Sequence, residues 1–453
     1  MSHYTRFSPR ASLGAVGSHM RQIGMWDAVE QHVHIKQKVI EHTPTDKLLD
    51  GFINILAGGH GLVEVNTRVR PDEGLQRAFG RRACADQSTI SDTLNVCTTE
   101  NISQMGNAVM AIYRTLSQGY RHNYQEQYQL LDVDLTGMPA GRQGEGVTKG
   151  YFRDKKIRRG RQLGRVLATL YDEIVVERLY PGNRQLERSL QEMVLAAEAT
   201  LDLDKSRRRR TIIRVDGGGG RDADVNWLLE RGYQVLVKVK NWKRAAKLAE
   251  SVQDWQTDPK TGDRQVGWVE IPHAYLRPTQ QVAIRTPRKN GSWLRWVLVC
   301  TLAAEDLSWL ARQPSHRNVT LQQLAFTTLY AYDLRGGGIE TSFRGSKQGI
   351  GLIKRNKKRL AAQMMLVYLA QLAYNLLTWT HHHLALQARQ LQGFGPLRMI
   401  RDLFHIPGRI ELDAQGHVLE ITLSDAHALA RPFAHAYSSL LARHGLSLNL
   451  GQI

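Results

Sequence analysis

The stretch TIIRVDGGGG, residues 211–220, joins a short apolar run to an aspartate and four glycines. Isoleucine, valine and threonine favour strands, and a short apolar run bounded by glycine is typical of a buried strand. The sequence therefore predicts a strand over residues 211–215 with Asp216 at its end. No Lys-Ser or Lys-Thr pair follows the glycines, which excludes a phosphate-binding P-loop.

A second aspartate ends an apolar run upstream, in LLDVDLTGMPAG, residues 130–141. We favour Asp134 as the functional carboxylate because the apolar run reaches its end there and Thr136 follows. Side chains alternate along a strand, so Asp132 is expected on the same face and is the main competitor for this position.

The elements around these two aspartates predict the fold. They are, in order, strands over residues 128–135, 163–171 and 174–180, a helix over 184–201, a strand over 211–215, a helix over 223–231 and a strand over 233–239. This is the order of the ribonuclease H-like fold, an α/β fold with a mixed sheet and helices on both faces. The first and fourth strands are neighbours in that sheet, so Asp134 and Asp216 are expected to meet at one edge.

A third carboxylate, Glu340, lies in YDLRGGGIETSFRGSK, residues 332–347, and opens a basic helical stretch. Divalent cations prefer clustered oxygen ligands, and phosphodiester cleavage by two metal ions needs no covalent protein nucleophile. Two strand-end aspartates and a helical glutamate therefore indicate a metal-dependent enzyme that cuts DNA.

The composition agrees with a nucleic-acid partner. The chain has 453 residues, with 61 Lys and Arg against 42 Asp and Glu, a formal net charge of +19. Such a surplus favours a polyanionic partner. The three cysteines lack CxxC spacing, which argues against a zinc ribbon or disulfide scaffold and fits a reducing cytoplasm. We see no signal peptide and expect a cytoplasmic, nucleoid-associated protein.

One apolar stretch, residues 361–379, is long enough to raise the question of a membrane span. Gln363, Gln371 and Asn375 interrupt it. A transmembrane helix is usually free of such residues. We therefore expect a buried core helix and no membrane partner.

Five regions are predicted along the chain. They are an N-terminal helical, DNA-binding domain (1–125), the first part of the ribonuclease H-like core (126–240), a β-rich insertion (241–328), the second part of the core with the Glu340 helix (329–393) and a C-terminal appendage (394–453). Within the first, residues 75–97 predict a helix, a turn and a helix that Asp86 caps, which suits entry into a DNA groove. The insertion contains six of the nine tryptophans and predicted strands over 266–271, 281–285 and 293–302.

Several motifs together resemble those of a known family. DVDLTG around Asp134, IIRVDGG around Asp216 and the run Tyr332-x2-Arg335-x4-Glu340-x6-Lys347 resemble the DDE transposases of bacterial insertion sequences, in the group with a Tyr-Arg-Glu-Lys signature. The resemblance covers residues 75–379. It departs from the family in two places. Four residues separate Arg335 from Glu340 where the family usually has three, and four glycines follow Asp216 where Arg-Gly or Gly-Phe is more usual.

The resemblance implies a specific activity. Such enzymes cut double-stranded DNA at the ends of their element and join the freed 3′-hydroxyls to target DNA with Mg²⁺, for which Mn²⁺ can substitute. A homodimer on DNA is expected, because two element ends must be paired. Asp134, Asp216 and Glu340 would be the catalytic residues and metal ligands. The implied DNA-binding residues are Tyr332, Arg335, Arg344 and Lys347, with Trp293 and Trp296 as candidates to stack on a flipped base.

Other interpretations stay open at this point. The chain can be an inactive or domesticated relative that only binds DNA, or a ribonuclease H-like nuclease that cuts without joining. A tyrosine recombinase using Tyr332 is disfavoured, because that class needs several basic residues around its nucleophile. Three basic clusters, at residues 153–161, 205–210 and 238–244, are expected to bind the DNA backbone.

Overall fold

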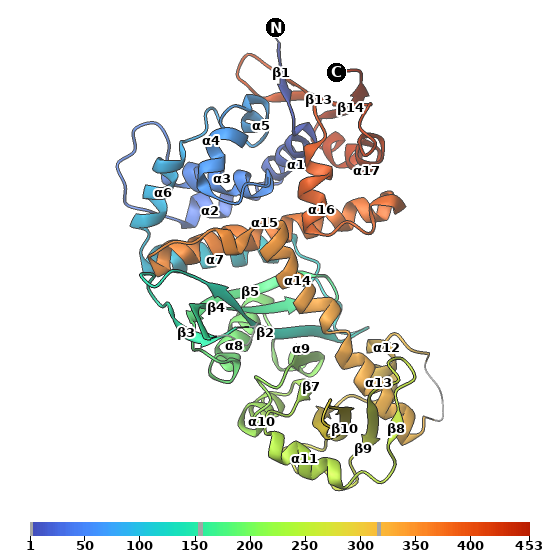
Figure 1. Ribbon diagram of the computed structural model, residues 1–453. Coiled ribbons are helices and arrows are strands. Elements are labelled where there is room, and N and C mark those ends of the chain that lie inside the picture. Colours follow the sequence, from blue (N-terminus) through green and yellow to red (C-terminus); the bar gives the residue numbers. More distant parts are fainter. Residues whose placement is uncertain (1–2, 153–156, 315–318) are drawn as a thin grey trace. The chain divides into compact units, whose positions relative to one another are not determined.

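Figure 1 shows a mixed α/β chain in a computed structural model that describes residues 3–152, 157–314 and 319–453. Two units divide the chain. The first comprises Met1–Ser117, Met138–Thr148 and Phe343–Ile453, and the second comprises Gln118–Gly137 and Lys149–Ser342.

A ten-stranded sheet organises the second unit. Its order is β3-β4-β2-β6-β7-β11-β10-β9-β8, with β5 paired to β4. The strands that correspond to the predicted core are β2 (Gln129–Pro139), β3 (Thr148–Tyr151), β4 (Ile157–Ala168), β5 (Glu173–Pro181), β6 (Thr211–Val215) and β7 (Gln234–Lys238). The central strands β2, β6 and β7 run parallel, while β4 and β5 are antiparallel.

The predicted core elements are all present, but β2 ends four residues later than predicted, β4 begins six residues earlier, and β3 was not predicted. Strand β6 covers the predicted residues 211–215, and all five side chains are buried. The hairpin between β4 and β5 turns at Asp172, whose φ is 50°. Helix α8 (Leu190–Leu201) begins later than predicted, after a short 3-10 turn at Leu186–Arg188. Helix α10 (Asp222–Glu230) ends before Gly232, which has a φ of +96° that favours glycine.

The predicted β-rich insertion extends the same sheet. Its strands are β8 (Gln256–Thr257), β9 (Gln265–Trp268), β10 (Gln280–Pro287) and β11 (Trp293–Cys300), so the three predicted strands are confirmed. Strand β11 pairs with β7, Val299 opposite Val237. Helices α11 (Trp242–Glu250), α12 (Ala304–Leu310) and α13 (Leu321–Asp333) also occur there. Helix α13 packs on β9 through Ala325 and Leu329, which join a buried cluster with Val266 and Ile284.

The first unit is mainly helical. Its helices are α1 (Ala11–Gln22), α2 (Asp27–His32), α3 (Pro44–Leu56), α4 (Val65–Arg68), α5 (Glu73–Ala78), α6 (Gln87–Val96), α7 (Thr99–Leu116), α15 (Leu360–Gln387), α16 (Pro396–Arg401) and α17 (Ala430–Ala442). Helix α15 packs against α3, α6, α7 and α17. It is long and apolar enough to cross a membrane, but 89% of its most apolar window is buried inside the protein. This agrees with the predicted core helix.

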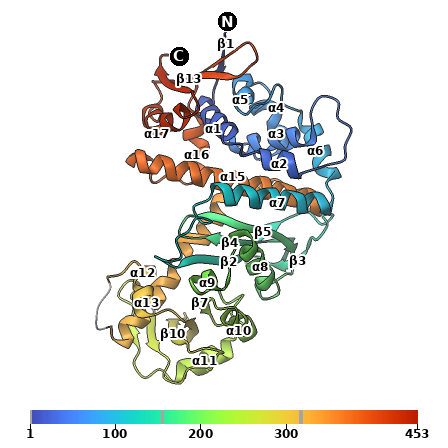
Figure 2. The ribbon, with the colours of Figure 1, turned by 180° about the vertical axis from the view of Figure 1, so that it is seen from behind.

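A second, four-stranded sheet completes the first unit. Its order is β1 (Tyr4–Ser8), β12 (Gly408–Leu412), β13 (Val418–Ser424) and β14 (Ser447–Gly451). Strand β1 is antiparallel to β12, with Ser8 opposite Gly408, and β13 and β14 are parallel. Figure 2 shows the N-terminal strand beside these C-terminal strands. No local sequence pattern predicts this pairing.

Candidate active site

Asp134 and Asp216 come together in the second unit, as predicted, but Asp134 does not close its strand, because β2 continues to Pro139. Asp134 lies in β2, and Asp216 directly follows β6. The two strands are parallel neighbours, and Val133 opposite Val215 is their last pair, so Asp134 and Asp216 are the next residues in register. The pKa of Asp134 is raised to about 6 overall. Burial raises it most, the Arg335 guanidinium lowers it, and the nearby Asp216 carboxylate raises it.

A buried arginine links these aspartates to the predicted glutamate. Arg335 Nη2 lies 2.6 Å from Asp134 Oδ2, and Arg335 Nη1 lies 3.5 Å from Glu340 Oε1. Burial lowers the pKa of Arg335, but the Asp134 and Asp216 charges outweigh this and raise it above its usual value. The side chain of Glu340 is 52% exposed. Among the described residues, the buried Arg335 Nε has no hydrogen-bond partner.

The competing carboxylate, Asp132, has a different set of partners. Arg214 donates from Nε to Asp132 Oδ1 at 2.6 Å and from Nη2 to Oδ2 at 2.8 Å, and Thr169 Oγ1 donates to Oδ2 at 2.7 Å. Arg214 also donates to the Ala331 carbonyl at 2.6 Å. Asp132 and Arg214 are fully buried. This closed set of partners leaves no face of the Asp132 carboxylate exposed to solvent.

A π-helical turn over Gly336–Glu340 accommodates the extra residue of the signature. In an α-helix the residue four positions after Arg335 would lie above it, and that residue is Ile339. A π-helix bonds at i→i+5 and takes one more residue per turn, which brings Glu340 to Arg335 instead. The departure from the usual spacing therefore preserves the contact between the arginine and the glutamate.

Glycine is required at one position of this turn. A Cβ atom on Gly338 would lie 2.8 Å from Thr169 Cγ2 and 2.9 Å from Asp132 Oδ2, whereas one on Gly336 or Gly337 would meet no atom within 4 Å. The turn is therefore seated against the closed Asp132 pair through Gly338.

The glycines after Asp216 shape the other side of the site. The Gly218 amide donates to Asp216 Oδ1 at 2.8 Å, which fixes the carboxylate at the strand end. A Cβ atom on Gly220 would lie 1.8 Å from the Lys238 carbonyl oxygen, so only glycine lets the chain cross the end of β7 here. The four-glycine departure thus reflects a turn that passes directly against the neighbouring strand.

Comparison with known proteins identifies the family. Residues 10–444 match the family model described as Transposase DDE domain group 1. The chain belongs to the DDE transposases. A cryo-EM structure of the piggyBac transposase synaptic complex with hairpin DNA is similar at 12% identity, covering 88% of this chain and 82% of that chain, with a TM-score of 0.46. No curated protein matches the chain.

Membership of the DDE transposases implies cleavage and transfer of phosphodiester bonds, and these enzymes generally use divalent metals. Among the residues that the structure describes, no group of three or more His, Cys, Asp or Glu side chains is placed to hold a metal ion. Asp134 and Asp216 are nonetheless hard oxygen donors at one edge, and their repulsion is offset by the Arg335 cation. This donor set fits a divalent cation.

In this transposase, Lys238 connects Tyr332 and Trp296 to the carboxylates. The ring centroids of Tyr332 and Trp296 are 6.0 Å apart, and Lys238 Nζ lies 4.6 Å from the Trp296 centroid. Burial lowers the pKa of Lys238, the Asp216 charge raises it and the Arg335 charge lowers it, so Lys238 lies within reach of both charges. In the sequence, Lys238 stands out only as part of the basic cluster at residues 238–244. Its position at the end of β7, beside the strand that ends at Asp216, was the available signal.

The other predicted DNA-binding residues have separate surroundings. The Arg285 guanidinium lies 4.3 Å from the Trp255 ring centroid and 4.5 Å from that of Trp293, so Trp293 already stacks on a cation. Arg344, at the end of α14 (Thr341–Arg344), is exposed and belongs to the first unit. Lys347, half-buried, lies in a second π turn, Gly345–Gly349, of that unit. Of the basic cluster at 153–161, residues 153–156 lie outside the described residues.

Proposed function

We propose that this chain is an active transposase, which cuts double-stranded DNA at transposon ends and joins the freed 3′-hydroxyls to target DNA. One observation carries the proposal. Asp134 and Asp216 follow the last paired residues of two neighbouring parallel strands, and the buried Arg335 connects Asp134 to Glu340 across a π turn. Three carboxylates gathered around one buried cation, in a chain of net charge +19, suit phosphodiester chemistry better than a structural role.

We propose further that the site is built on a ribonuclease H-like core. With the short β3 left out of the count, the path β5-β4-β2-β6-β7 reads third, second, first, fourth and fifth in order along the chain. The parallel pairing of β2 with β6 and of β6 with β7, and the antiparallel pairing of β4 with β5, support this assignment. That arrangement brings together Asp134 of the first strand and Asp216 after the fourth strand.

Asp134 and Asp216 would hold the divalent cation, Mg²⁺ or Mn²⁺, and Glu340 would have to move toward them to be the third ligand, because no group of three carboxylates is in place among the described residues. When bound, the cation activates a water or 3′-hydroxyl and neutralises the developing phosphate charge. Arg335 would position Asp134 and Glu340, with which it forms ion pairs. Lys238, held over the Trp296 ring, adds a cation for the DNA backbone.

The proposed partner is double-stranded DNA, at the transposon ends and at the target. Because both ends must be cut and joined in one event, we propose that two copies of the chain act together on DNA. The large basic surplus supplies the salt-dependent attraction that such a complex needs.

The test uses a duplex that carries the DNA flanking the gene, with Mg²⁺ and a target plasmid. We expect Asp216→Ala and Glu340→Ala to bind this duplex normally and to lose both cleavage and joined products. Asp263→Ala, which removes an exposed carboxylate of the same unit, is the control and should react normally.

Two other results would change the proposal. Normal cleavage by either site variant would contradict the proposed metal site. Cleavage without joined products by the unaltered protein would identify a nuclease instead.

A further inference from the structure

We propose that α6 and residues 354–359 together form one DNA-binding surface of the first unit, in which 354–359 contacts phosphates and α6 contacts base edges. The inference rests on the proposed function and specifies where the element end is recognised. The two segments are far apart in the sequence but are in direct contact in the fold. Neither segment includes a residue of the carboxylate site.

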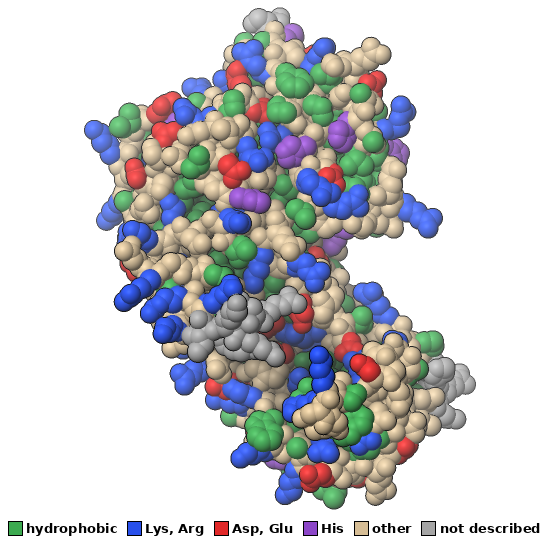
Figure 3. Space-filling model, viewed as in Figure 1, with side chains coloured by type: hydrophobic (Ala, Val, Ile, Leu, Met, Phe, Trp, Pro, Cys, Tyr) green, Lys and Arg blue, Asp and Glu red, His purple; other side chains and the backbone are tan. Residues whose placement is uncertain are grey.

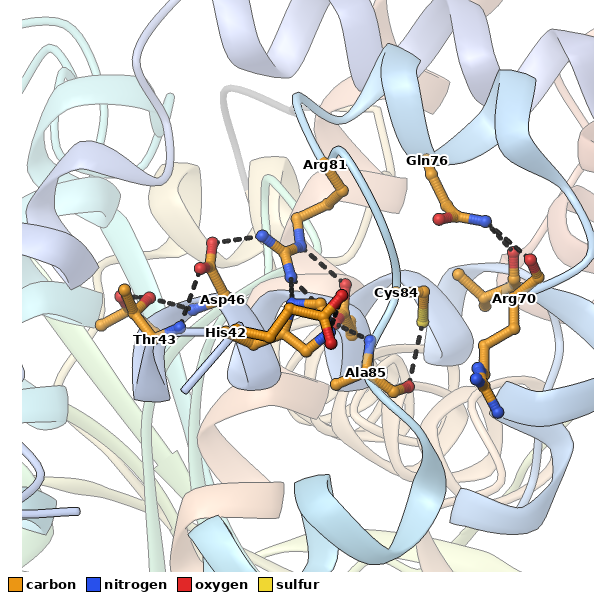
Figure 4. Close-up of polar contacts among 12 residues, drawn as sticks. His42, Thr43, Asp46, Arg70, Gln76, Arg81, Cys84 and Ala85 are labelled. Atoms are coloured by element: carbon orange, nitrogen blue, oxygen red, sulfur yellow. Dashed lines mark hydrogen bonds and ion pairs between the residues drawn. The ribbon is translucent and has the colours of Figure 1, made fainter. Parts of the chain in front are cut away.

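The loop that leads into α6 is firmly held. Figure 4 shows Arg81 between Asp46 and His42, in an ion pair with Asp46 and 3.2 Å from His42 Nδ1. Arg81 Nε also donates to the buried Asp50 Oδ1 at 2.8 Å, and the Ala85 amide donates to Asp50 Oδ2 at 2.8 Å. This buried network fixes the backbone one residue before the N-cap of α6.

Helix α6 then presents one polar face. Asp86 caps it by accepting from the Ser88 amide at 2.7 Å and the Thr89 amide at 3.1 Å. Ser88, Asp92 and Asn95 are exposed at positions i, i+4 and i+7, so they lie along one side of the helix. The buried positions of the helix are Ile90, Thr93 and Leu94. Short polar side chains on a rigid, exposed helix face are suited to contacts in the major groove.

Residues 354–359 form a pinned segment with outward cations. Arg355 is buried and donates to the carbonyls of Ile350 and Gly59. Gln363 accepts from the Lys357 amide at 2.8 Å and donates to the Arg355 carbonyl at 2.9 Å. Lys354, Lys358 and Arg359 are exposed on this fixed backbone. Holding cations in place lowers the entropy lost when each binds a phosphate.

Direct contacts join the segment to the helix. Lys357 Nζ donates to Ser91 Oγ at 2.6 Å, and Arg359 donates to the Asn95 carbonyl in the last turn of α6. A cation at a helix C-terminus is favourable for the helix dipole. Figure 3 shows Lys and Arg side chains gathering along the side of the first unit where α6 lies. The polar face of α6 therefore has cations beside it from a second segment.

Duplex DNA is the partner that this chemistry favours. The exposed residues of the surface are cations and short polar groups with little apolar area beyond Val96, which disfavours a protein or membrane partner. Cations supply affinity for any sequence, whereas the helix face supplies discrimination among bases. Asp92 can accept from a cytosine amino group.

Binding without metal separates the two roles. We would measure fluorescence anisotropy of the full chain with a 30-bp duplex from the DNA flanking the gene and with a scrambled duplex, over a salt series. For Lys354→Ala/Lys358→Ala, the slope of log affinity against log salt should fall by about 2 on both duplexes, at about 0.9 per lost phosphate contact. The control Arg409→Ala/Arg443→Ala removes two exposed cations elsewhere in the unit and should leave the slope unchanged.

A variant of the α6 face should change the preference between duplexes and leave the salt slope unchanged. Ser88→Ala/Asn95→Ala should lower the preference for the flanking duplex by about 5-fold or more, with an unchanged salt slope. The inference would be overturned if Lys354→Ala/Lys358→Ala and Arg409→Ala/Arg443→Ala had equal salt slopes. It would also be overturned if the helix variant kept its preference for the flanking duplex. Cleavage in Mg²⁺ is scored separately. Loss of cleavage with the binding pattern intact counts only against the proposed function.

Discussion

Asp132 and Asp134 lie two residues apart on β2, but their surroundings differ. Asp132 is fully buried, and Arg214 and Thr169 occupy both of its oxygens. Asp134, two residues later, shares its arginine with Glu340, and the charge of Asp216 acts on it. The first pair is a closed structural contact, whereas the second is an open one at the edge of the sheet. Asp134 is the more accessible of the two carboxylates, and it is therefore the one that can take part in chemistry.

The largest effect should come from Asp134. Asp134→Asn keeps the shape of the side chain but removes the charge that a divalent cation needs. We expect DNA cleavage to fall roughly 10⁴-fold, as loss of one member of a catalytic set typically gives. Single-turnover cleavage of the flanking duplex measures this. A variant that cleaves at more than a tenth of the normal rate would show that Asp134 is not a metal ligand.

Asp132 should show the reverse, a loss of stability. Asp132→Ala leaves Arg214 buried without its partner, and we expect the free energy of unfolding to fall by about 3–5 kcal/mol. Replacing both residues, as Asp132→Leu/Arg214→Met, should restore much of that loss, because no buried charge remains. Urea unfolding measures both. If the folded double variant cleaves no DNA, Asp132 does more than stabilise the sheet.

The pH dependence of stability should distinguish the open pair. The folded pKa of Asp134, about 6, lies above the ordinary value of 3.8, so folding is favoured by its proton below pH 4 and this contribution is lost as the pH rises through 6. Relative to Asp134→Asn, the unaltered chain should lose up to about 3 kcal/mol between pH 4 and pH 7. Urea unfolding at several pH values tests this. Parallel curves for the two proteins would contradict it.

The smallest expected effect concerns the turn that connects the two pairs. Gly338→Ala places a Cβ against Thr169 and Asp132, and should cost about 1–3 kcal/mol as an overpacked contact. The matched control is Gly337→Ala, which meets open space and should be neutral or stabilise by up to about 1 kcal/mol. Thermal unfolding of both variants gives the comparison. Equal effects at the two positions would mean that the turn is not seated on the Asp132 pair.

Local sequence was enough to predict most of the second unit's strands. The apolar run before Asp216 and the hairpin at Asp172 are short-range signals, and the structure confirms both. Helix α11 was missed because its tryptophan and neighbouring strands suggested β structure, although its charged and apolar residues alternate with a helical period. The pairing of β1 with β12 depends on residues far apart in sequence, and no local pattern encodes it.

The site was predicted by residue type and strand position but not by partner. The sequence DVD presents two equivalent aspartates, and only the fold shows that Arg214 belongs to one and Arg335 to the other. The extra glycine residue looked like a departure from the family spacing. It is the residue that a π turn needs to return Glu340 to Arg335. The sequence indicates Lys238 only as part of a basic cluster. Its contact with Trp296 depends on the order of strands in the sheet, which local sequence does not show. The five predicted domain boundaries stay a prediction.

The pairing of Ser8 with Gly408 also has a consequence for the order of events on the ribosome. Strand β1 emerges first, yet its partner β12 is made only after the second unit has been translated in full. At about 5–20 residues per second, β1 waits roughly 20–80 s with its edge unpaired. The second unit can therefore fold while the first unit is still incomplete.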